Sequence, residues 1–381
     1  MGMLFSAVKN VVKSIVISII KKLPPKKIIV FESCPDLSDN TKAVFDELVR
    51  RGCNKKYKLV WMCYEPIRAE YPKIKNVKYV NAQSRLAFYR YVLSGKCIIC
   101  CNRLYEADRQ DQTFFYLTHG FPLKDTRSYY VCPSYVTYML SPSVHAVDIM
   151  AKNFNVSKEK CVPLGFPRND VLVTARRDLS GVFGHFDQYI VWYPTVKQFA
   201  DGKTAGSAKP IPFLDSRENA EILNEAAKSR NALIIIKPHF AQVKSSIRQF
   251  EFSNLRFIDD RFFLDHGISS YELIGSCDAL LTDYSSVCFD YVLTNKPIGF
   301  IWEDIEDYKK DPGLVDEYEY LCKCGRKIYT FEQLNDFVLH FEDDIPLFEK
   351  ERAEIAQYTN FTDGKSAERV SDFIESCLES R

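Results

Sequence analysis

Short apolar runs alternate with helical segments along most of the chain, and this alternation restricts the fold more than any other feature. In the first half, strands are predicted at residues 27–32, 57–62, 77–80, 97–101 and 114–117. In the second half, they are predicted at residues 189–193, 233–236, 257–258, 279–281 and 298–300. Helices are predicted between these strands at residues 42–51, 84–94 and 218–229. Such a pattern is typical of parallel sheets covered by helices, so we expect an α/β fold with two Rossmann-like domains facing a cleft.

The length of 381 residues suits two domains better than one. We assign residues 27–154 to an N-terminal Rossmann-like domain and residues 155–360 to a C-terminal one. Residues 361–381 are expected to form a C-terminal helix. The formal net charge is only +1, which argues against nucleic acid as a partner. Attraction to an anionic partner would therefore need a local cluster of basic residues.

The 13 cysteines do not follow a zinc-binding pattern. Cys97, Cys100 and Cys101 lie in an apolar run that is predicted to be a buried strand, and Cys322 with Cys324 forms the other close group. A second pair at zinc-ribbon spacing and nearby histidines are both missing. Buried free thiols in a reducing cytoplasm are the favoured interpretation, and structural zinc is the alternative.

The N-terminus has the pattern of an amphipathic helix. Apolar residues recur at helical spacing over residues 3–22, while Lys9 and Lys13 fall on the other side. Lysines inside the run argue against a membrane-spanning helix, and the lack of a small-residue cleavage site argues against a secretory signal. We predict that residues 1–26 form an amphipathic membrane-binding helix lying at the bilayer surface. Packing on the protein itself or on a partner subunit is the alternative.

Polar residues directly follow two of the predicted strands, at the position where such sheets bind ligands. His119, with Gly120 after it, ends the strand at residues 114–117. With an ordinary pKa of ~6.5, a histidine can take a proton from a hydroxyl near neutral pH. Lys237 and His239 end a strand of the second half, where a cation and an imidazole can neutralise a pyrophosphate. The structural alternative for both is a strand end fixed by hydrogen bonds.

A second kind of candidate is a phosphate-binding turn. Ser285 and Ser286 follow a strand and precede a helical pattern, so free backbone N–H groups and hydroxyls can bind phosphate there. An ordinary helix cap needs no ligand and is compatible with this interpretation. Arg168 lies in a turn after Gly165 and can bind phosphate through two nitrogens, or it can form a salt bridge between domains.

Several catalytic motifs are absent from the sequence. The chain has no GxxxxGK[ST] loop, no GxGxxG after a strand and no GxSxG elbow, which argues against ATP-dependent kinases, dinucleotide redox enzymes and serine hydrolases. Histidines and carboxylates are not clustered at metal-ligand spacing. We therefore predict no metal and no cofactor.

Taken together, these segments resemble the CDP-glycerol glycerophosphotransferase family, the teichoic acid primases and polymerases. The resemblance covers roughly residues 110–375. The family motifs HGTPLK, GYPRND, APTWR, TDYSS, FDY and NKP are similar to residues 119–124, 165–170, 193–197, 282–286, 289–291 and 295–297. There are departures from the family pattern: Phe121 replaces Thr, Lys197 stands where Arg is usual, and the KLHP motif becomes Lys-Pro-His-Phe around His239.

The resemblance implies a two-domain fold of GT-B type and an enzyme that transfers a polyol phosphate, with release of CMP. Glycerol phosphate is the favoured group, and the acceptor would be a hydroxyl of a lipid-linked or surface polysaccharide, in teichoic acid or capsule-type synthesis. The N-terminal domain would bind the acceptor and the C-terminal domain the CDP donor. The catalytic residues implied are His119 and His239. The donor and phosphate ligands implied are Arg168, Thr195, Lys237, Asp283, Ser285 and Ser286. The acceptor or secondary residues implied are Gly120, Lys124 and Lys197.

The expected partners are CDP-glycerol or a related CDP-polyol, a lipid-linked saccharide or polyol phosphate polymer, and the membrane surface. Nucleic acid is not expected, and a homo-oligomer is compatible with the sequence. The expected location is peripheral, on the cytoplasmic face of the cell membrane. Two other functions stay open: a nucleotide-sugar glycosyltransferase of the same shape, and a non-catalytic polymer-binding scaffold.

Overall fold

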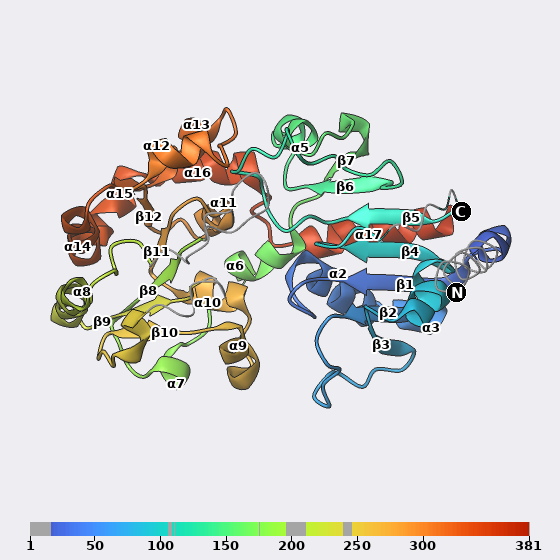
Figure 1. Ribbon diagram of the computed structural model, residues 1–381, viewed down its shortest axis with the longest axis horizontal. Helices are drawn as coiled ribbons and strands as arrows, with labels where there is room; N and C mark the ends of the chain where they lie inside the picture. Colours follow the sequence, from blue (N-terminus) through green and yellow to red (C-terminus); the bar gives the residue numbers. More distant parts are fainter. Residues whose placement is uncertain are drawn as a thin grey trace, which may run out of the picture.

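Two parallel β-sheets lie side by side, with helices packed around each of them (Figure 1). The computed structural model describes residues 17–105, 109, 111–174, 176–195, 211–238 and 246–380. Each sheet is built by its own half of the chain. The predicted α/β architecture is therefore confirmed.

The first sheet has seven strands in the order β3-β2-β1-β4-β5-β6-β7. All of its pairings are parallel. Its strands are β1 (Lys26–Glu32), β2 (Lys58–Cys63), β3 (Val77–Asn81), β4 (Gly95–Cys100), β5 (Thr113–Tyr116), β6 (Tyr138–Ser141) and β7 (Cys161–Pro163).

The second sheet has six strands in the order β10-β9-β8-β11-β12-β13, and its pairings are parallel too. In both sheets the order of the strands reverses at the same place, between β1 and β4 in the first sheet and between β8 and β11 in the second. This is the Rossmann strand order, in which ligands bind beyond the carboxyl ends of the strands at the reversal. The strands are β8 (Gln188–Tyr193), β9 (Ala232–Ile236), β10 (Leu255–Phe257), β11 (Ala279–Thr282), β12 (Ile298–Ile301) and β13 (Arg326–Ile328).

The strands form where the sequence is apolar without interruption. Every residue of β9 and β11 is buried, as are the last five residues of β1. A strand that is buried on both faces must be covered by helices on both sides, which a parallel sheet with helical crossovers provides. The predicted thiols Cys97, Cys100 and Cys101 are buried in β4 and at its end.

Helices connect the strands and close the outer faces. The first half contains α2 (Asp39–Arg50), α3 (Cys53–Lys56), α4 (Arg85–Ala87) and α5 (Val147–Asn153). The link between the sheets contains η3 (Pro167–Asn169), α6 (Asp170–Thr174) and α7 (Ser180–Phe183). The second half continues with α8 (Arg217–Ser229), α9 (Asp260–His266), α10 (Ser270–Ser276), α11 (Val287–Tyr291), α12 (Ile305–Lys310), α13 (Tyr318–Leu321), α14 (Phe331–His340), α15 (Asp344–Leu347), α16 (Glu349–Thr359) and α17 (Ser366–Glu379).

The last helix, α17, returns to the first half of the molecule (Figure 1). Arg51, which follows α2, forms ion pairs with Asp372 and Glu375 of α17. The ring of Phe373 packs edge-on against Phe115 in β5. The first sheet also extends to β7, beyond residue 154, because the loop after Phe154 leads into one more strand of the same sheet. The division into domains at residues 26, 154 and 360 stays a prediction.

The end of the N-terminal segment is fixed to the first half by a buried arginine. Residues 17–22 are helical, and Arg109 donates hydrogen bonds to the carbonyl oxygens of Ile20 (3.0 Å) and Leu23 (2.8 Å). Most of the predicted amphipathic helix, residues 1–16, lies outside the described residues, so this prediction is not tested. In the part of the chain that is described, no helix is long and apolar enough to cross a membrane.

Candidate functional site

The turn after β5 presents His119 at the carboxyl edge of the first sheet. Both neighbours of His119 have positive φ, +54° at Thr118 and +148° at Gly120. Asn40, in the first turn of α2, donates its side-chain amide to the carbonyl oxygens of Leu117 and Thr118, each at 3.2 Å. The His119 side chain is exposed. The turn is thus fixed through its backbone, while the imidazole faces solvent.

The surroundings of His119 favour the neutral imidazole. The protein around the ring lowers the pKa of His119, and the nearby cations Arg168 and Lys124 act in the same direction. Asp39 and a hydrogen bond with the Cys101 backbone oppose this shift. A neutral imidazole is the form that can accept a proton.

Arg168 joins the two halves of the molecule. Its Nη1 donates to Asp39 Oδ1 and to the His119 carbonyl oxygen, both at 2.8 Å. Its Nη2 donates to Asp290 Oδ2 at 2.7 Å, and the Tyr271 hydroxyl donates to the same oxygen at 2.6 Å. The structure therefore places the Arg168 charge in a buried ion pair between the halves, the alternative that the sequence left open. Donor binding by Arg168 is not tested by this geometry.

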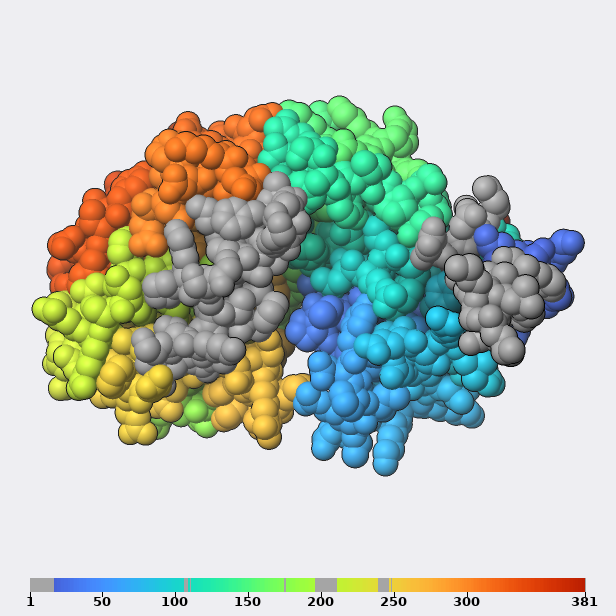
Figure 2. Space-filling model, viewed as in Figure 1, coloured from blue at the N-terminus to red at the C-terminus, as the bar shows by residue number. Residues whose placement is uncertain are grey.

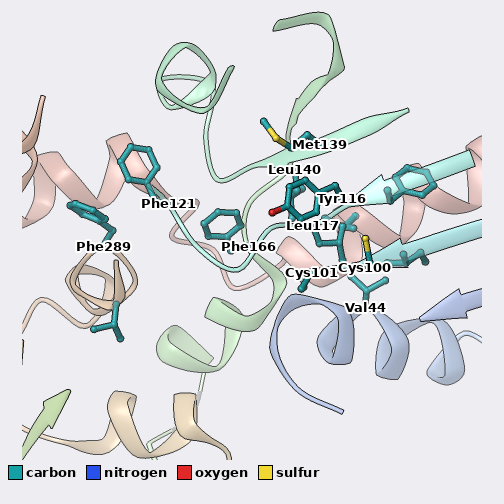
Figure 3. Close-up of a cluster of buried hydrophobic side chains, with 14 of the residues drawn as sticks. Val44, Cys100, Cys101, Tyr116, Leu117, Phe121, Met139, Leu140, Phe166 and Phe289 are labelled. Atoms are coloured by element: carbon teal, nitrogen blue, oxygen red, sulfur yellow. The ribbon is translucent and has the colours of Figure 1, made fainter. Parts of the chain in front are cut away.

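Gly120 brings the first sheet's turn against the second half. A Cβ atom on Gly120 would lie 2.6 Å from Ser286 Oγ and 3.2 Å from Arg168 Nη2, so only glycine fits without displacement. Next to it, the rings of Phe121 and Phe289 meet edge-to-face with centroids 5.0 Å apart (Figure 3). Three segments that are far apart in sequence therefore converge at one point: residues 118–124, residues 165–170 and residues 282–290.

Asp283 organises the opposite side of this junction. Its carboxylate accepts hydrogen bonds from the Thr195 backbone N–H (2.8 Å), the Thr195 hydroxyl (2.7 Å) and the Tyr284 N–H (2.7 Å). Burial raises the pKa of Asp283, and these donors, together with Lys124, oppose the shift. Burial lowers the pKa of Lys124, and the charge of Asp283 opposes this shift. Thr195, Asp283 and Lys124 are therefore neighbours.

The turn that carries His119 is also tied to the second half further along the chain. Residues 123–125 pair with residues 313–315 as a short antiparallel bridge, with hydrogen bonds of 3.0 and 3.1 Å. Arg127 adds an ion pair of 2.9 Å with Asp316. Although this loop leaves the first sheet, it is attached to both halves.

Ser285 and Ser286 lie at the start of α11, as the sequence predicts. The Ser285 hydroxyl accepts a hydrogen bond from the Val287 N–H at 3.4 Å, which is the geometry of a cap. Ser286 is the N-cap residue of α11, but its side chain accepts no capping bond within the described residues. Both side chains are partly exposed, and that of Ser286 lies against Gly120.

Lys237 follows β9, beside the end of β8. Its amine lies 3.0 Å from Asp260 Oδ1 and 5.7 Å from the centre of the Tyr193 ring, two residues before Thr195. The remaining predicted site residues, His239 and Lys197, lie outside the described residues. Nine of the eleven residues named from the sequence therefore lie in the described part of the chain. Gly120 lies against Ser286, and Arg168 contacts the His119 backbone, while the role of each of the eleven stays a prediction.

The NKP segment supports the fold instead of the site. Asn295 adopts a left-handed conformation with φ of +53° and accepts a hydrogen bond from Arg352 Nε at 3.0 Å. Lys296 donates to the carbonyl oxygen of Gly275 at 3.0 Å. These contacts attach the segment that leads into β12 to α16 and α10.

Four contributors were missed by sequence reasoning. Asp39 and Asn40 lie in the polar stretch after the first strand, and Tyr271 lies in α10. Asp290 belongs to the FDY segment, which was recognised but given no partner. The available signal was the arginine at position 168, because a buried arginine requires carboxylates near it.

A family model described as CDP-Glycerol:Poly(glycerophosphate) glycerophosphotransferase matches residues 15–376. The chain belongs to this family. Its relatives include the teichoic acid ribitol-phosphate primase of Bacillus spizizenii, 27% identical over 254 residues, which cover 64% of this chain and 60% of the primase. The teichoic acid glycerol-phosphate transferase of Staphylococcus aureus is 24% identical over 424 residues, covering 96% of this chain and 99% of that protein. The chain spans only 60% of this primase, 54% of the teichoic acid poly(ribitol-phosphate) polymerase of Bacillus spizizenii and 50% of the teichoic acid poly(glycerol phosphate) polymerase of Staphylococcus epidermidis.

Solved structures agree on the fold of this glycerophosphotransferase family member. The wall teichoic acid polymerase TagF superposes with a TM-score of 0.77 at 22% identity, covering 99% of this chain and 97% of that one. A TagF variant soaked with CDPG superposes with a TM-score of 0.78 at 21% identity. At this level of identity the likeness shows a shared fold. The soak with CDPG concerns TagF and is not evidence of what this chain binds.

Proposed function

We propose that this chain transfers a polyol phosphate, most simply glycerol phosphate, from a CDP-activated donor to a hydroxyl of a lipid-linked or surface-polymer acceptor. The observation that carries the proposal is the convergence of residues 118–124, 165–170 and 282–290 between the two sheets. Family membership and the named activities of the relatives support the same reaction.

In this proposal His119 is the general base. Its exposed imidazole takes the proton of the acceptor hydroxyl, and the hydroxyl oxygen attacks the distal phosphorus of the donor. A new P–O bond to the acceptor forms as the bond to the bridging oxygen breaks, and CMP leaves with the electron pair. The lowered pKa of His119 keeps the imidazole neutral before the attack.

The donor phosphates would lie against the second half. Ser285 and Ser286 offer hydroxyls at the start of α11, Thr195 is oriented by Asp283, and Lys237 supplies a positive charge. His239 is proposed to stabilise the charge on departing CMP. Preorganised donors of this kind act where charge develops, so positioning and charge neutralisation supply most of the rate.

Gly120, Lys124 and Lys197 remain proposed as acceptor-side or secondary residues. Arg168 is the residue whose proposed role changes most, because its two Nη groups already bind two carboxylates and the His119 backbone. We give Arg168 a positioning role, because it holds the His119 backbone at a fixed place relative to Asp290 of the second half.

The setting of the reaction is also a proposal. An amphipathic helix at residues 1–26 would hold the enzyme at the cytoplasmic face of the membrane, next to a lipid-linked acceptor in teichoic acid or capsule-type synthesis. The hydrogen bonds from Arg109 to the carbonyl oxygens of Ile20 and Leu23 support this, since they would attach such a helix to the first half.

The released nucleotide tests the proposal. Purified protein is incubated with a lipid-linked acceptor fraction and, in turn, CDP-glycerol, CDP-ribitol, UDP-sugars and GDP-sugars, and the nucleotide products are separated by chromatography. Release of CMP from one CDP-polyol is the expected result. Release of UDP or GDP would assign the chain to the glycosyltransferases, and silence with every donor would favour the scaffold alternative.

A further inference from the structure

A groove runs along the outer edge of the first sheet, beside the edge strand β3. It is formed by the loop between β2 and β3 together with the start of β3. This loop projects at the lower edge of the first half in Figure 1. Its volume is about 580 Å³. It is lined by Ile67, Arg68, Ala69, Tyr71, Pro72, Lys73, Ile74, Lys75, Val77, Lys78 and Tyr79.

The groove is basic in a chain that is otherwise almost neutral. Arg68, Lys73, Lys75 and Lys78 line it, and all four are exposed. Residues 64–80 contain these four cations against two glutamates, an excess of two positive charges, whereas the whole chain has a formal charge of +1. In the part of the chain that the structure describes, none of the four forms an ion pair with a carboxylate.

Between the cations lie apolar and phenolic surfaces. The rings of Tyr71 and Tyr79 are 5.0 Å apart, and the Tyr79 hydroxyl donates to the Pro72 carbonyl oxygen at 3.1 Å. Burial raises the pKa of both tyrosines to about 12, so they are neutral phenols at physiological pH. Ile67 is 50% exposed. A ligand that fits must combine negative charge with uncharged carbon and hydroxyl groups.

The groove begins near the junction of the two halves. The Asp36 carboxylate accepts hydrogen bonds from the N–H groups of Tyr64 (2.9 Å) and Glu65 (3.0 Å), which fixes the start of the loop beside the segment that follows β1. Burial raises the pKa of Asp36, and the nearby Arg68 is among the groups that oppose this shift. In the same segment, burial raises the pKa of the Cys34 thiol, and the charge of Asp260 in α9 adds to this rise, so the segment lies near the second half. Figure 2 shows an indentation there, between the blue and the yellow parts of the surface.

We propose that this groove binds the polyol phosphate chain of the acceptor, several units away from the end that reacts. The inference rests on the proposed function and extends it to a second contact with the substrate. A polyol phosphate chain alternates negative phosphates with short hydroxylated carbon segments, which matches the alternation of cations with phenolic and apolar side chains. The cations line a concave surface, which favours a chain over a flat bilayer.

The test compares two triple variants. Lys73, Lys75 and Lys78 are changed together to Gln, and the matched control changes Lys158, Lys228 and Lys350, three exposed lysines on other elements. A fluorescent poly(glycerol phosphate) oligomer is titrated against each full-length protein and followed by anisotropy. Because exposed charge contacts are weak singly and act together, we expect about tenfold weaker binding for the groove variant, and no change for the control.

Turnover separates this proposal from the proposed function. With a single-unit acceptor, CMP release should be the same in the wild type and the groove variant, while the KM for a long acceptor should rise about tenfold. Equal oligomer binding by the groove variant and the wild type would overturn the inference. The inference would also be overturned if the groove variant bound anionic vesicles more weakly than the wild type but bound the oligomer equally well. The groove would then be a membrane contact. Weaker oligomer binding without CMP release from any protein would support the groove and reject the proposed reaction.

Discussion

Arg168 Nη2 lies 2.7 Å from Asp290 Oδ2, and this buried ion pair connects the two halves of the molecule. The other terminal nitrogen of the same guanidinium contacts Asp39 at the start of α2 and the backbone oxygen of His119. Any change in how the halves meet would therefore move the candidate base. The arginine sets the geometry of the site through its three partners.

Asp290→Asn should destabilise the protein strongly, because it leaves the buried Arg168 charge with one carboxylate in place of two. Loss of one partner of a buried pair costs about 3 kcal/mol or more. The free energy of unfolding, measured in urea, tests this. Asp316→Asn is the matched control, since its pairs with Arg127 and Lys152 are on the surface and contribute about 1 kcal/mol or less. Equal losses in both variants would contradict the assigned role of Asp290.

Gly120→Ala should lower both stability and turnover. The added methyl group would lie 2.6 Å from Ser286 Oγ, and overpacking of this kind costs about 1–3 kcal/mol. Gly181→Ala is the control, because nothing lies within 4 Å of its Cβ position. Combining Gly120→Ala with Ser286→Gly should restore part of the stability. The melting temperatures of the wild type, the two single glycine variants and the double variant test this. A melting temperature of Gly120→Ala equal to that of the wild type would refute the close contact.

His119→Ala should abolish most turnover and leave the fold intact, since the side chain is exposed. General-base help is worth about 100-fold or more. CMP release is measured alongside circular dichroism, with the exposed His185→Ala as control. If the His119 variant kept more than about a tenth of the wild-type rate, another group would have to be the base.

The pH profile should follow the lowered pKa of His119. A base must be neutral to act, so activity is present above its pKa and is lost as the pH falls through it. Because the pKa is lowered, the acidic limb of kcat/KM should lie below pH ~6.5, the ordinary value for histidine. A limb that lies above this value would show that the ring is not desolvated as described.

The strands and the strand-end residues could be predicted from the sequence, because uninterrupted apolar runs have few structural solutions. β6, β7 and β13 were not predicted, because their sequences YMLS, CVP and RKI are interrupted by polar residues or proline. Thr195 and Asp283 were named only as ligands that the family resemblance implies, and the hydrogen bond between them was not predicted. What no local pattern gives is the partner of a charge that lies more than a hundred residues away, as for Arg168 with Asp39 and Asp290.

Phe121 shows the same limit. It stands where the family motif has a threonine, directly after the proposed catalytic turn. In the structure the ring is buried against Phe289 of the second half, so the larger side chain fills space between the halves (Figure 3). Whether a side chain after a catalytic turn faces ligand or core depends on the second sheet, which contributes its residues much later in the chain.

The most direct test of the account follows the acceptor and the nucleotide in one reaction. Protein, CDP-glycerol and a purified lipid-linked acceptor are incubated, and CMP is quantified while the acceptor is weighed by mass spectrometry. The account predicts one CMP for every glycerol phosphate added, with both products lost in His119→Ala. CMP release without any gain in acceptor mass, or a gain that corresponds to a sugar, would contradict it.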